Sequence, residues 1–375
     1  MSKLTRYAFA SKKVRDTLDP GGQKRLFTWH FFYRTVANLS RIDTMTITRL
    51  GVVAGMLFAA SAATAADITP AVVFDMGGKF DKSFNQGVFD GVERFKAETG
   101  IEYREFEVTN ETQREQALRR MAQRGANPIL GVGFAQAGPM ETVAKEFPDT
   151  KFTIIDGVVD LPNVQSVVFK EHEGSFLVGL LAAMASENNM VGFVGGMDIP
   201  LIRRFACGYE QGAKHANATV GVIQNMTGST PSAWNDPGRG SELAKGQFDR
   251  GVDVIYAAAG GTGVGVYQAA KDGGKLAVGV DSNQNYMHPG TMLTSMLKRV
   301  DVAAYNAFNE AMNDTWAPGF KVLGLAEEGV GWALDEHNES LVTEEMKAAV
   351  EVATAGIIAG EISVHDYMSD SSCTY

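Results

Sequence analysis

The sequence predicts an α/β protein made of two doubly wound, Rossmann-like lobes with a ligand cleft between them. Its 375 residues are too many for one ordinary domain and suit two, each large enough to bury its own core. Short apolar runs alternate with amphipathic stretches of helical period, and this alternation occurs in two consecutive series. Sheets built in this way are parallel, and ligands bind beyond the carboxyl ends of their strands.

The first strand and helix lie within residues 70–91, which read PAVVFDMGGKFDKSFNQGVFDG. Residues 71–74 are apolar without alternation, which is typical of a parallel strand buried on both faces. Asp75 follows at the carboxyl end of this strand, and two glycines then allow a sharp turn. Asp75 is therefore predicted to lie where ligands bind.

The helix after this turn is capped by either Asp81 or Ser83, and its first turn contains Phe84 and Asn85. The loop and the helix start thus offer a carboxylate, an aromatic ring and an amide to a ligand. A phenylalanine at such a position is ordinarily part of the core, so the pattern alone does not make Phe84 a ligand contact.

The remaining elements continue the alternation. The first series contains helices at 84–98, 112–124 and 136–147 and strands at 103–108, 128–132, 152–155 and 166–169. After a break near residues 170–173, the second series contains helices at 174–186, 200–216, 240–250 and 264–272 and strands at 190–194, 220–225, 252–257 and 276–280. A further strand at 293–297 and helices at 302–316 and 344–358 follow.

The charge is uneven along the chain. Residues 1–66 hold ten of the 34 Lys and Arg residues but three of the 44 Asp and Glu residues, so residues 67–375 carry a formal net charge of −17. A body this acidic repels phosphate backbones and anionic lipid. Nucleic acid and membrane surfaces are therefore not expected as partners of the folded part.

Residues 45–66 have the pattern of a cleaved secretory signal peptide, with a positive start, a short apolar stretch and small residues before the cleavage site. We expect Met45 to be the true start, residues 1–44 to be an upstream extension, and the mature protein to begin near Asp67 in the periplasm. There is no cysteine at the cleavage site to anchor a lipid. The rival interpretation of residues 1–44, a DNA-binding headpiece, lacks a helix-turn-helix pattern.

The two cysteines, Cys207 and Cys373, have no second cysteine or histidine nearby that would make a zinc pattern. Nothing in their spacing asks for a disulfide, so we do not expect one. The histidines are scattered without the spacing of metal ligands. The sequence predicts neither a metal nor a cofactor.

Three predicted strands end in an aspartate, at Asp75, Asp156 and Asp281. One aspartate at such a place is more often a turn or helix cap than a ligand contact. Three of them, distributed over both lobes, favour a ligand site. Ionised carboxylates accept strong hydrogen bonds from hydroxyl and ring N–H groups, so a neutral polar ligand fits them.

The string AAAGGTGVGV, residues 257–266, places Gly260 directly after a strand in the second series. Gly260 could allow a ligand close to the backbone, or could serve a tight strand-to-helix turn. The string is not a dinucleotide fingerprint, because Val266 stands where a glycine is needed. Trp234 lies in a polar loop and is a candidate stacking partner for a ligand.

An enzyme is the weaker hypothesis. Asp75 and Asp281 would be the carboxylate pair of a hydrolase, but they belong to different lobes and nothing in the sequence fixes their separation. The chain has no G-x-S-x-G elbow, and its histidines have no obvious serine or cysteine partner. We therefore assign no catalytic residue.

Several motifs resemble the basic membrane protein family of ABC-transporter solute receptors, whose best-known members bind purine nucleosides. They are FDMGGKFDKSFNQG, IIDG, VGFVGGMDIPLIRRFACGYEQGA, AAAGGTGVGV, VGVD and TSMLKRVD. The resemblance, which includes these motifs, extends over nearly all of the chain after the signal peptide. The resemblance implies the type I periplasmic binding protein fold. It also implies a receptor that closes over its ligand and presents it to an inner-membrane permease.

The resemblance also implies roles for individual residues. Phe84 resembles the aromatic residue that stacks on the base in this family, and Lys298 resembles a lysine directed at the ribose. Two other interpretations of Lys298 are a surface lysine and a lysine that forms an ion pair with Asp281 and so ties the lobes together. The ligand-binding set is Asp75, Asn85 and Asp156 as hydrogen-bonding partners, Phe84 in stacking, and Asp281, Gly260 and Lys298 at the sugar, with Trp234 as a further contact.

By the same resemblance, residues 67–170 and about 291–318 form lobe one, and residues 171–290 and about 319–375 form lobe two. The strand at 293–297 and the helix after it would cross back to complete lobe one, and the tail from residue 320 would rejoin lobe two. We expect a monomer. A free purine base, another heterocycle or a sugar is the alternative ligand.

Overall fold

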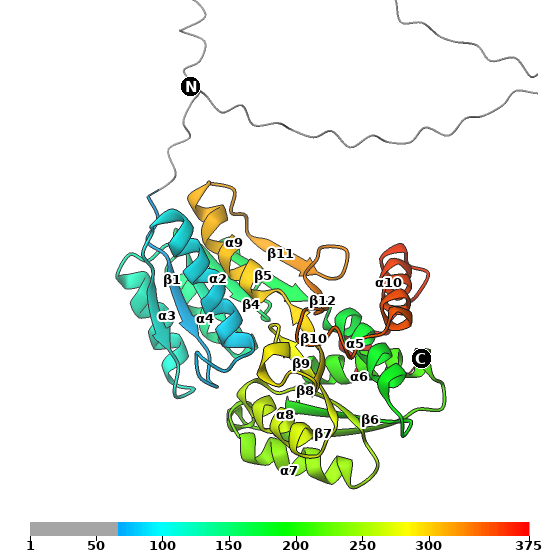
Figure 1. The fold of residues 1–375 in the computed structure, drawn as a ribbon. Helices are drawn as coiled ribbons and strands as arrows, with labels where there is room; N and C mark the ends of the chain where they lie inside the picture. The colour runs from blue at the N-terminus through cyan, green and yellow to red at the C-terminus, as the bar shows by residue number, and fades with distance from the viewer. Residues whose placement is uncertain (1–66, 375) are drawn as a thin grey trace, which may run out of the picture. The chain divides into compact units, whose positions relative to one another are not determined.

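The computed structural model describes residues 67–374, which contain two parallel β-sheets covered by helices (Figure 1). The predicted signal peptide at residues 45–66 and the extension at residues 1–44 lie outside the described residues. The two lobes predicted from the alternating pattern are confirmed, with one sheet in each.

The first sheet has the strand order β11-β5-β4-β3-β1-β2, and every neighbouring pair in it is parallel. Its strands are β1 (Ala71–Phe74), β2 (Arg104–Glu107), β3 (Ile129–Val132), β4 (Phe152–Ile155), β5 (Val164–Phe169) and β11 (Gly319–Leu323). Strands β1, β3 and β4 are buried along their whole length, which agrees with their unbroken apolar sequences.

The second sheet has the order β12-β10-β9-β8-β6-β7 and is parallel except for the edge pair β10 and β12. Its strands are β6 (Met190–Met197), β7 (Gly221–Gly228), β8 (Val254–Ala258), β9 (Leu276–Asp281), β10 (Met292–Lys298) and β12 (Val330–Trp332). Strand β12, of three residues, was not anticipated from the sequence.

Helices cover both faces of each sheet. In lobe one, α2 (Phe84–Thr99) packs beside α9 (Val300–Met312), and α3 (Gln113–Gln123) packs beside α4 (Ala137–Glu146). In lobe two, α5 (Glu171–Ala185) packs beside α6 (Pro200–Ala216), and α7 (Pro237–Phe248) packs beside α8 (Gly263–Asp272). The remaining helices are α10 (Glu344–Ala359) and α11 (Tyr367–Asp370).

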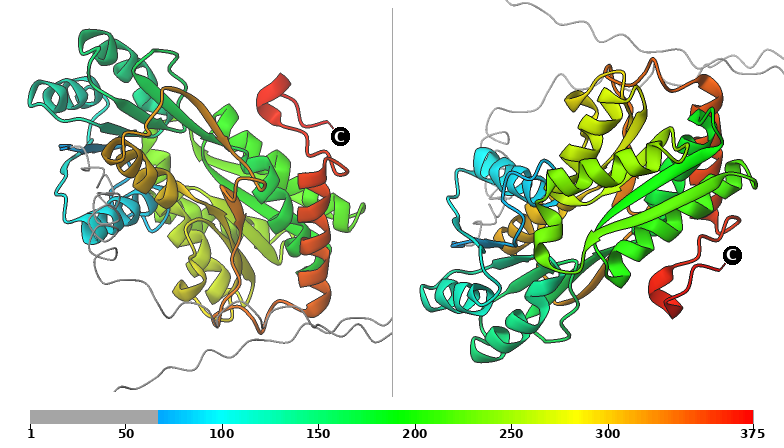
Figure 2. Two further views of the ribbon diagram at one scale, coloured as in Figure 1. Left: turned by 90° about the horizontal axis from the view of Figure 1, so that it is seen from above. Right: turned by 90° about the horizontal axis from the view of Figure 1, so that it is seen from below.

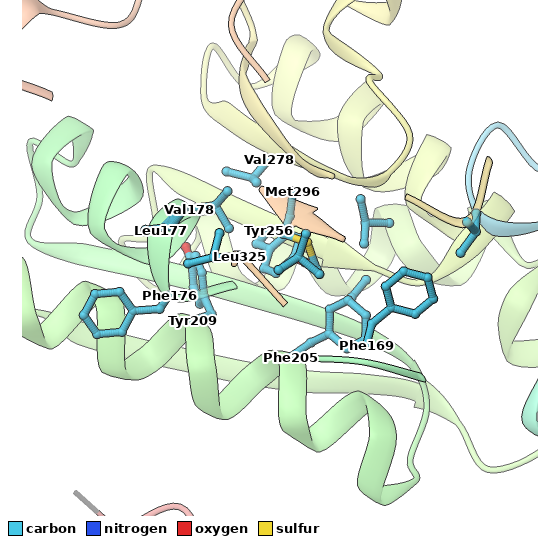
Figure 3. Packing of buried hydrophobic residues seen from close by; sticks show 14 of the residues in the cluster. Phe169, Phe176, Leu177, Val178, Phe205, Tyr209, Tyr256, Val278, Met296 and Leu325 are labelled. Carbon is cyan, nitrogen blue, oxygen red and sulfur yellow. The ribbon is translucent and has the colours of Figure 1, made fainter. Parts of the chain in front are cut away.

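The core follows from the alternation of side chains along each strand. In β1, Val72 and Phe74 belong to the cluster that includes residues of α2 and α9, whereas Ala71 and Val73 belong to the cluster of α3 and α4. The first of these clusters continues into the α5 and α6 side of lobe two. Figure 3 shows this part, where Tyr209 of α6 lies close to Tyr256 of β8.

The connections between the lobes differ from those expected. Strand β10 pairs with β9 and β12, so residues 293–297 belong to the second sheet and not to lobe one. Conversely, β11 extends the first sheet, so residues 319–323 do not rejoin lobe two. Helix α9 does cross back and packs against α2. Gly91 of α2 permits this close packing, because a Cβ there would lie 2.1 Å from the Asp301 carbonyl oxygen.

Cys207 and Cys373 form a disulfide, which corrects the expectation that they would stay unpaired. The sequence separation of 166 residues hides their proximity, since the segment after α10 folds back against α6. Figure 2 shows this C-terminal segment in red beside the green helices. Within residues 67–374, no helix is both long and apolar enough to cross a membrane.

Candidate functional site

One cavity lies at the carboxyl ends of strands from both sheets, and all eight residues predicted for the ligand site line it. These are Asp75, Phe84, Asn85, Asp156, Trp234, Gly260, Asp281 and Lys298. Asp75 and Asp156 follow β1 and β4 of the first sheet, whereas Asp281 and Lys298 end β9 and β10 of the second. The parallel topology thus brings together residues that are more than 200 positions apart in the sequence.

Asp75 is held by an arginine that the sequence analysis missed. Arg114 of α3 donates from both Nε and Nη2 to Oδ1 of Asp75, at 2.9 and 2.8 Å. Burial raises the pKa of Asp75, and the Arg114 guanidinium opposes this rise. Gly133 makes room for the other oxygen, because a Cβ at Gly133 would lie 2.9 Å from Oδ2 of Asp75.

The start of α2 is capped by Asp81, which decides between the two candidates. Its carboxylate accepts hydrogen bonds from the backbone N–H groups of Ser83 at 2.8 Å, Asn85 at 3.0 Å and Gln86 at 3.1 Å. Burial raises the pKa of Asp81 to about 6. The Ser83 hydroxyl is therefore free for a contact outside the helix, and it donates to the Asp281 carboxylate of lobe two.

Asn85 has a fixed orientation. Its side-chain amide donates to the carbonyl oxygens of Asp75 and Gly78, at 3.4 and 3.3 Å. Two carbonyls cannot pair with an amide oxygen, so Oδ1 of Asn85 must point away from them. That oxygen is buried and has no hydrogen-bond partner among the described residues.

Lys298 is the centre of a buried ion cluster. Its ammonium lies 2.6 Å from Oδ2 of Asp156 and 2.8 Å from Oε1 of Glu171, with side-chain exposures of 2%, 6% and 1% for the three residues. These are the ion pairs that the structure gives Lys298, in place of the pair with Asp281 considered from the sequence. The other oxygen of Asp156, Oδ1, is buried and has no partner among the described residues.

Three aromatic rings also surround the Lys298 ammonium. The ring centroids of Phe84, Phe169 and Phe205 lie 5.2, 5.1 and 5.5 Å from Nζ. Figure 3 shows Phe169 and Phe205 next to each other at one end of the core. A cation over ring faces is attracted by their quadrupoles, so the rings help to retain the charge inside the protein.

The electrostatics of the cluster follow from burial and pairing. Burial raises the pKa values of Asp156 and Asp281 to about 6, although Lys298 opposes both shifts. For Lys298, burial alone would lower the pKa, but the surrounding carboxylates outweigh it and raise the pKa. Lys298 therefore stays charged at neutral pH, whereas the two aspartates are each half ionised near pH 6.

Asp156 and Asp281 share an uncommon backbone conformation. Their φ angles are 65° and 63°, in the left-handed region that residues other than glycine rarely adopt. Strain of this kind persists where the surrounding contacts over-determine it, and it is enriched at ligand sites. The third strand-end aspartate, Asp75, has no such angle.

Trp234 and Gly260 form one wall of the cavity. Trp234 closes a short helical turn, Pro231–Trp234, after β7, and its ring lies close to Gly196 of β6. A Cβ at Gly196 would lie 2.1 Å from a ring carbon of Trp234, so glycine is required there. Gly260 has φ 56°, and a Cβ on it would lie 3.3 Å from the Trp234 carbonyl oxygen.

The lobes also contact each other directly beside the cavity. Besides the bond from Ser83 to Asp281, the Ser282 hydroxyl donates to the Ser83 carbonyl at 3.1 Å, and the Gln284 amide donates to the Lys82 carbonyl at 2.8 Å. These contacts join the start of α2 to the loop after β9. They belong to a conformation in which the lobes have met.

Sequence reasoning missed several residues that hold or line the site from neighbouring helices. Arg114, Glu171, Arg204 and Phe205 lie on helices, away from the strand ends where the search was made. Glu171 and Arg204 are paired with each other at 2.9 Å. Glu171 begins α5 beside His172 and Glu173, so it resembles an ordinary polar helix start and gave no local signal of a buried ion pair.

Comparisons with known proteins agree with this geometry. The family described as "ABC transporter substrate-binding protein PnrA-like" matches residues 68–367. An uncharacterised lipoprotein of Pyrococcus abyssi is 36% identical over 278 residues, which cover 71% of this chain and 69% of the relative. The ABC transporter nucleoside-binding protein BmpA of Lactococcus lactis is 30% identical over 321 residues, 80% of this chain and 89% of BmpA.

The solved structures give the same result. An ABC transporter solute-binding protein of Aeropyrum pernix has a TM-score of 0.74 at 30% identity, over 79% of this chain and 92% of that protein. A putative LacI-family repressor of Corynebacterium glutamicum has a TM-score of 0.52 at 15% identity, over 73% and 99%, and so shares only the fold. The predicted fold is confirmed. The chain belongs to the Bmp family of ABC transporter substrate-binding proteins, which are binding proteins and not enzymes.

Proposed function

We propose that the protein is a periplasmic receptor that binds a purine nucleoside between its two lobes and delivers it to an inner-membrane ABC permease. The observation that carries the proposal is a pair of buried acceptors in the cavity, Oδ1 of Asn85 and Oδ1 of Asp156, which have no hydrogen-bond partner among the described residues. A buried polar atom without a partner costs about 1–3 kcal/mol. A ligand with suitably placed N–H or O–H groups removes that cost when it binds.

Two kinds of wall favour a nucleoside over simpler ligands. Phe84, Phe134 and Trp234 offer aromatic surface to a planar base. Asp281 and the neighbouring Gly260 backbone suit the hydroxyls of a ribose, because an ionised carboxylate accepts from two hydroxyls at once. The relative BmpA, which is named as nucleoside-binding, supports the same class of ligand.

We assign the residues as the family resemblance implies. Asp75, Asn85 and Asp156 accept hydrogen bonds from the base, and Phe84 stacks on it, with Trp234 as a further aromatic contact. Asp281, Gly260 and Lys298 lie at the sugar.

The charge of the cavity argues against nucleotides. Asp75, Asp81, Asp156 and Asp281 line it, against the single ammonium of Lys298. Lys298 is already paired with Asp156 and Glu171, so it has little charge to offer a phosphate. A phosphate group would meet excess negative charge in a poorly solvated site, and a neutral nucleoside would not.

The direct contacts between the lobes link ligand binding to delivery of the ligand to the permease. A ligand that touches both lobes favours the closed conformation by the difference between its affinities for the closed and open forms. The closed form is then the one that the permease distinguishes from the empty receptor. Secretion through the signal peptide predicted at residues 45–66 gives the receptor access to the permease from the periplasm.

The test is the melting temperature of the secreted, purified protein against a panel of purine and pyrimidine nucleosides, free bases, pentoses, amino acids and inosine monophosphate. A ligand at a hundredfold excess over its Kd adds about 2.7 kcal/mol to the free energy of unfolding. We expect inosine, guanosine or adenosine to raise the melting temperature, and inosine monophosphate to leave it unchanged. A shift with pentoses or amino acids alone would refute the nucleoside assignment.

A free purine base is the second candidate, because the unpartnered Asn85 oxygen could be satisfied by a base without a sugar. The panel separates the two. If adenine or hypoxanthine shifts the melting temperature more than the matching nucleoside does, the carboxylate of Asp281 serves the lobe contact with Ser83 and not a ribose.

A further inference from the structure

The segment after α10 folds back onto helix α6 and is fastened there at three points. We call residues 364–374 the C-terminal strap (Figure 2). The backbone N–H of His365 donates to Oε1 of Gln211 at 2.7 Å, and the Gln211 amide donates to the His365 carbonyl at 3.0 Å. Cys373 is bonded to Cys207, which is itself buried. The third point is Asp366.

Asp366 forms an ion pair with one arginine of α6, Arg204. Its two carboxylate oxygens accept from Nε and Nη2 of Arg204, both at 2.7 Å. The remaining nitrogen, Nη1, donates to the Phe169 carbonyl at 2.7 Å and to Glu171 at 2.9 Å. The planar guanidinium is thereby fixed by partners on two sides, with little freedom to rotate.

The same ion chain reaches the ligand cavity. Glu171 contacts Lys298 at 2.8 Å, and Lys298 contacts Asp156 at 2.6 Å. Five alternating charges therefore run from the strap to a residue that lines the cavity. Only the outer end is substantially exposed, since the Asp366 side chain has 30% exposure and that of Glu171 has 1%. Buried charges are weakly screened, so each ion in the chain affects the next.

Helix α6 provides a second connection between strap and cavity. Arg204 stands directly before Phe205 in the chain, and Phe205 and Ile202 line the cavity. The Phe205 ring also faces the Lys298 ammonium at 5.5 Å. Any shift of α6 that follows release of the strap would therefore move both the aromatic wall and the ion chain.

We propose that the C-terminal strap is a positioning element of the ligand site: Asp366 orients Arg204, Arg204 and Glu171 fix Lys298 against Asp156, and the Cys207–Cys373 disulfide keeps Asp366 in place. The proposal goes beyond the proposed function and rests on it only in taking this cavity as the ligand site. Affinity for the ligand then depends on an intact disulfide. A receptor that works in an oxidising compartment keeps that bond, whereas disulfides are rarely maintained in the cytosol.

The first experiment needs no ligand. A double-mutant cycle combines Asp366→Asn with Asp156→Asn in the full-length protein and measures the free energy of unfolding of all four forms. The two residues share no direct contact in the structure, so their effects add unless the ion chain couples them. We expect clear non-additivity. Additive effects would overturn the proposal.

A matched control lies one residue away on the same helix. Arg203, which precedes Arg204 on α6, donates two hydrogen bonds to Asp198, at 2.7 and 2.8 Å. This pair is exposed and does not reach the cavity. The cycle of Asp198→Asn with Asp156→Asn should be additive. Coupling of the same size in both cycles would show a general charge effect and would also overturn the proposal.

The second experiment measures affinity for inosine. Cys373→Ser removes the disulfide without changing the buried Cys207, and reduction of the wild type by excess dithiothreitol gives two thiols while the reagent becomes its own cyclic disulfide. We expect a three- to tenfold loss of affinity in both cases, and none for Arg203→Ala. Unchanged affinity in Cys373→Ser would refute the role of the disulfide. If inosine does not bind, the purine nucleoside that raises the melting temperature replaces it. Failure of every purine nucleoside to bind the wild type would refute the proposed function and leave the cycle as the test of the strap.

A pH profile separates positioning from mere stability. Arg204→Gln removes one positive charge from the chain, so the charge of Lys298 is shared more with Glu171 and less with Asp156. The groups facing Asp156 are Lys298, Glu171 and Asp281, and none of them is changed by this substitution. We expect the pH midpoint for inosine binding to move upward. A loss of stability with an unmoved midpoint would contradict the proposal.

Discussion

The two ends of the cavity are built from the same residue types but in opposite ways. At the Asp75 end, one carboxylate is paired with one arginine on its outer side, and the Asn85 oxygen beside it has no partner. At the Lys298 end, one ammonium is shared by Asp156 and Glu171 and enclosed by three aromatic rings. The first end is ready to exchange partners with a ligand, whereas the second is already a structural unit that joins the lobes.

The difference shows that groups available to bind a ligand and groups that stabilise the fold can lie side by side in one cavity. Asp156 shows both, since its Oδ2 holds Lys298 and its Oδ1 is left for a ligand. Removing a charge at the Lys298 end should therefore damage the fold, whereas removing one at the Asp75 end should damage mainly binding.

The largest effect is expected for Lys298→Met. The substitution leaves the buried Asp156 without its cation and leaves Glu171 with Arg204 as its remaining ion pair. Breaking a buried ion pair in this way costs about 3–5 kcal/mol. Chemical denaturation of the ligand-free protein measures it. A loss below about 1 kcal/mol would mean that the Lys298 end is not the structural unit described. The triple replacement of Lys298, Asp156 and Glu171 by Met, Asn and Gln should recover part of the loss, because it removes the unpaired charges.

A pH effect of intermediate size should also come from the Lys298 end. Burial raises the pKa values of Asp156 and Asp281 to about 6, well above the 3.8 of an exposed aspartate. Between about pH 4 and pH 6 the folded protein therefore binds more protons than the unfolded chain, and these two groups make stability fall as the pH rises through that window. Asp281→Asn should make this fall smaller, as followed by melting curves at closely spaced pH values.

Ligand affinity should change in the opposite direction over the same window. Carboxylates that accept hydrogen bonds from ribose or base must be ionised, so affinity should rise as the pH increases from about 4 to 6 and then level off. Calorimetric titration with inosine at each pH measures this. An affinity that is constant from pH 4 to pH 7 would mean that neither aspartate contacts the ligand in its charged form.

At the Asp75 end, Asp75→Asn should reduce affinity about tenfold, since a hydrogen bond to a charged group contributes about 1.5–3 kcal/mol. Asparagine keeps an oxygen for Arg114, so the free energy of unfolding should fall much less than in Lys298→Met. Glu111→Gln is the control, because Glu111 is exposed and influences Asp75 only through its charge. Equal losses of stability in Asp75→Asn and Lys298→Met would remove the distinction between the two ends.

The same distinction explains how much of the molecule the sequence could reveal. Strand-end aspartates are visible as an apolar run followed by Asp, and all three line the cavity as that pattern predicts. Arg114 and Arg204 are not visible in this way, because a helical arginine has the same local pattern whether it is solvated or pairs with a buried carboxylate. Pairing is decided by which helix faces which sheet edge, and that is set by tertiary contacts.

Two errors have the same origin. The strand at Met292–Lys298 is apolar enough for either sheet, and its place beside β9 depends on the loop before it and on the antiparallel strand β12, which is too short to detect. The disulfide joins α6 to a segment 166 residues later, and nothing in local spacing records that approach. Long-range pairing leaves no periodic trace in a single sequence.

The smallest effect on stability and affinity is expected at the Trp234 wall of the cavity, between the Asp75 end and the Lys298 end. In Gly196→Ala the new methyl group would lie 2.1 Å from a ring carbon of Trp234, so the ring must move. Because the Trp234 side chain lines the cavity and can shift toward it, the loss of stability should be near the lower end of overpacking penalties, about 1 kcal/mol. Inosine affinity should fall by a few-fold if the ring contacts the base. Gly246→Ala, where no atom lies within 4 Å of the new methyl group, is the matched control and should leave affinity unchanged. If Gly196→Ala lowers stability but leaves inosine affinity unchanged, the ring only closes the wall, and base stacking falls to Phe84 alone.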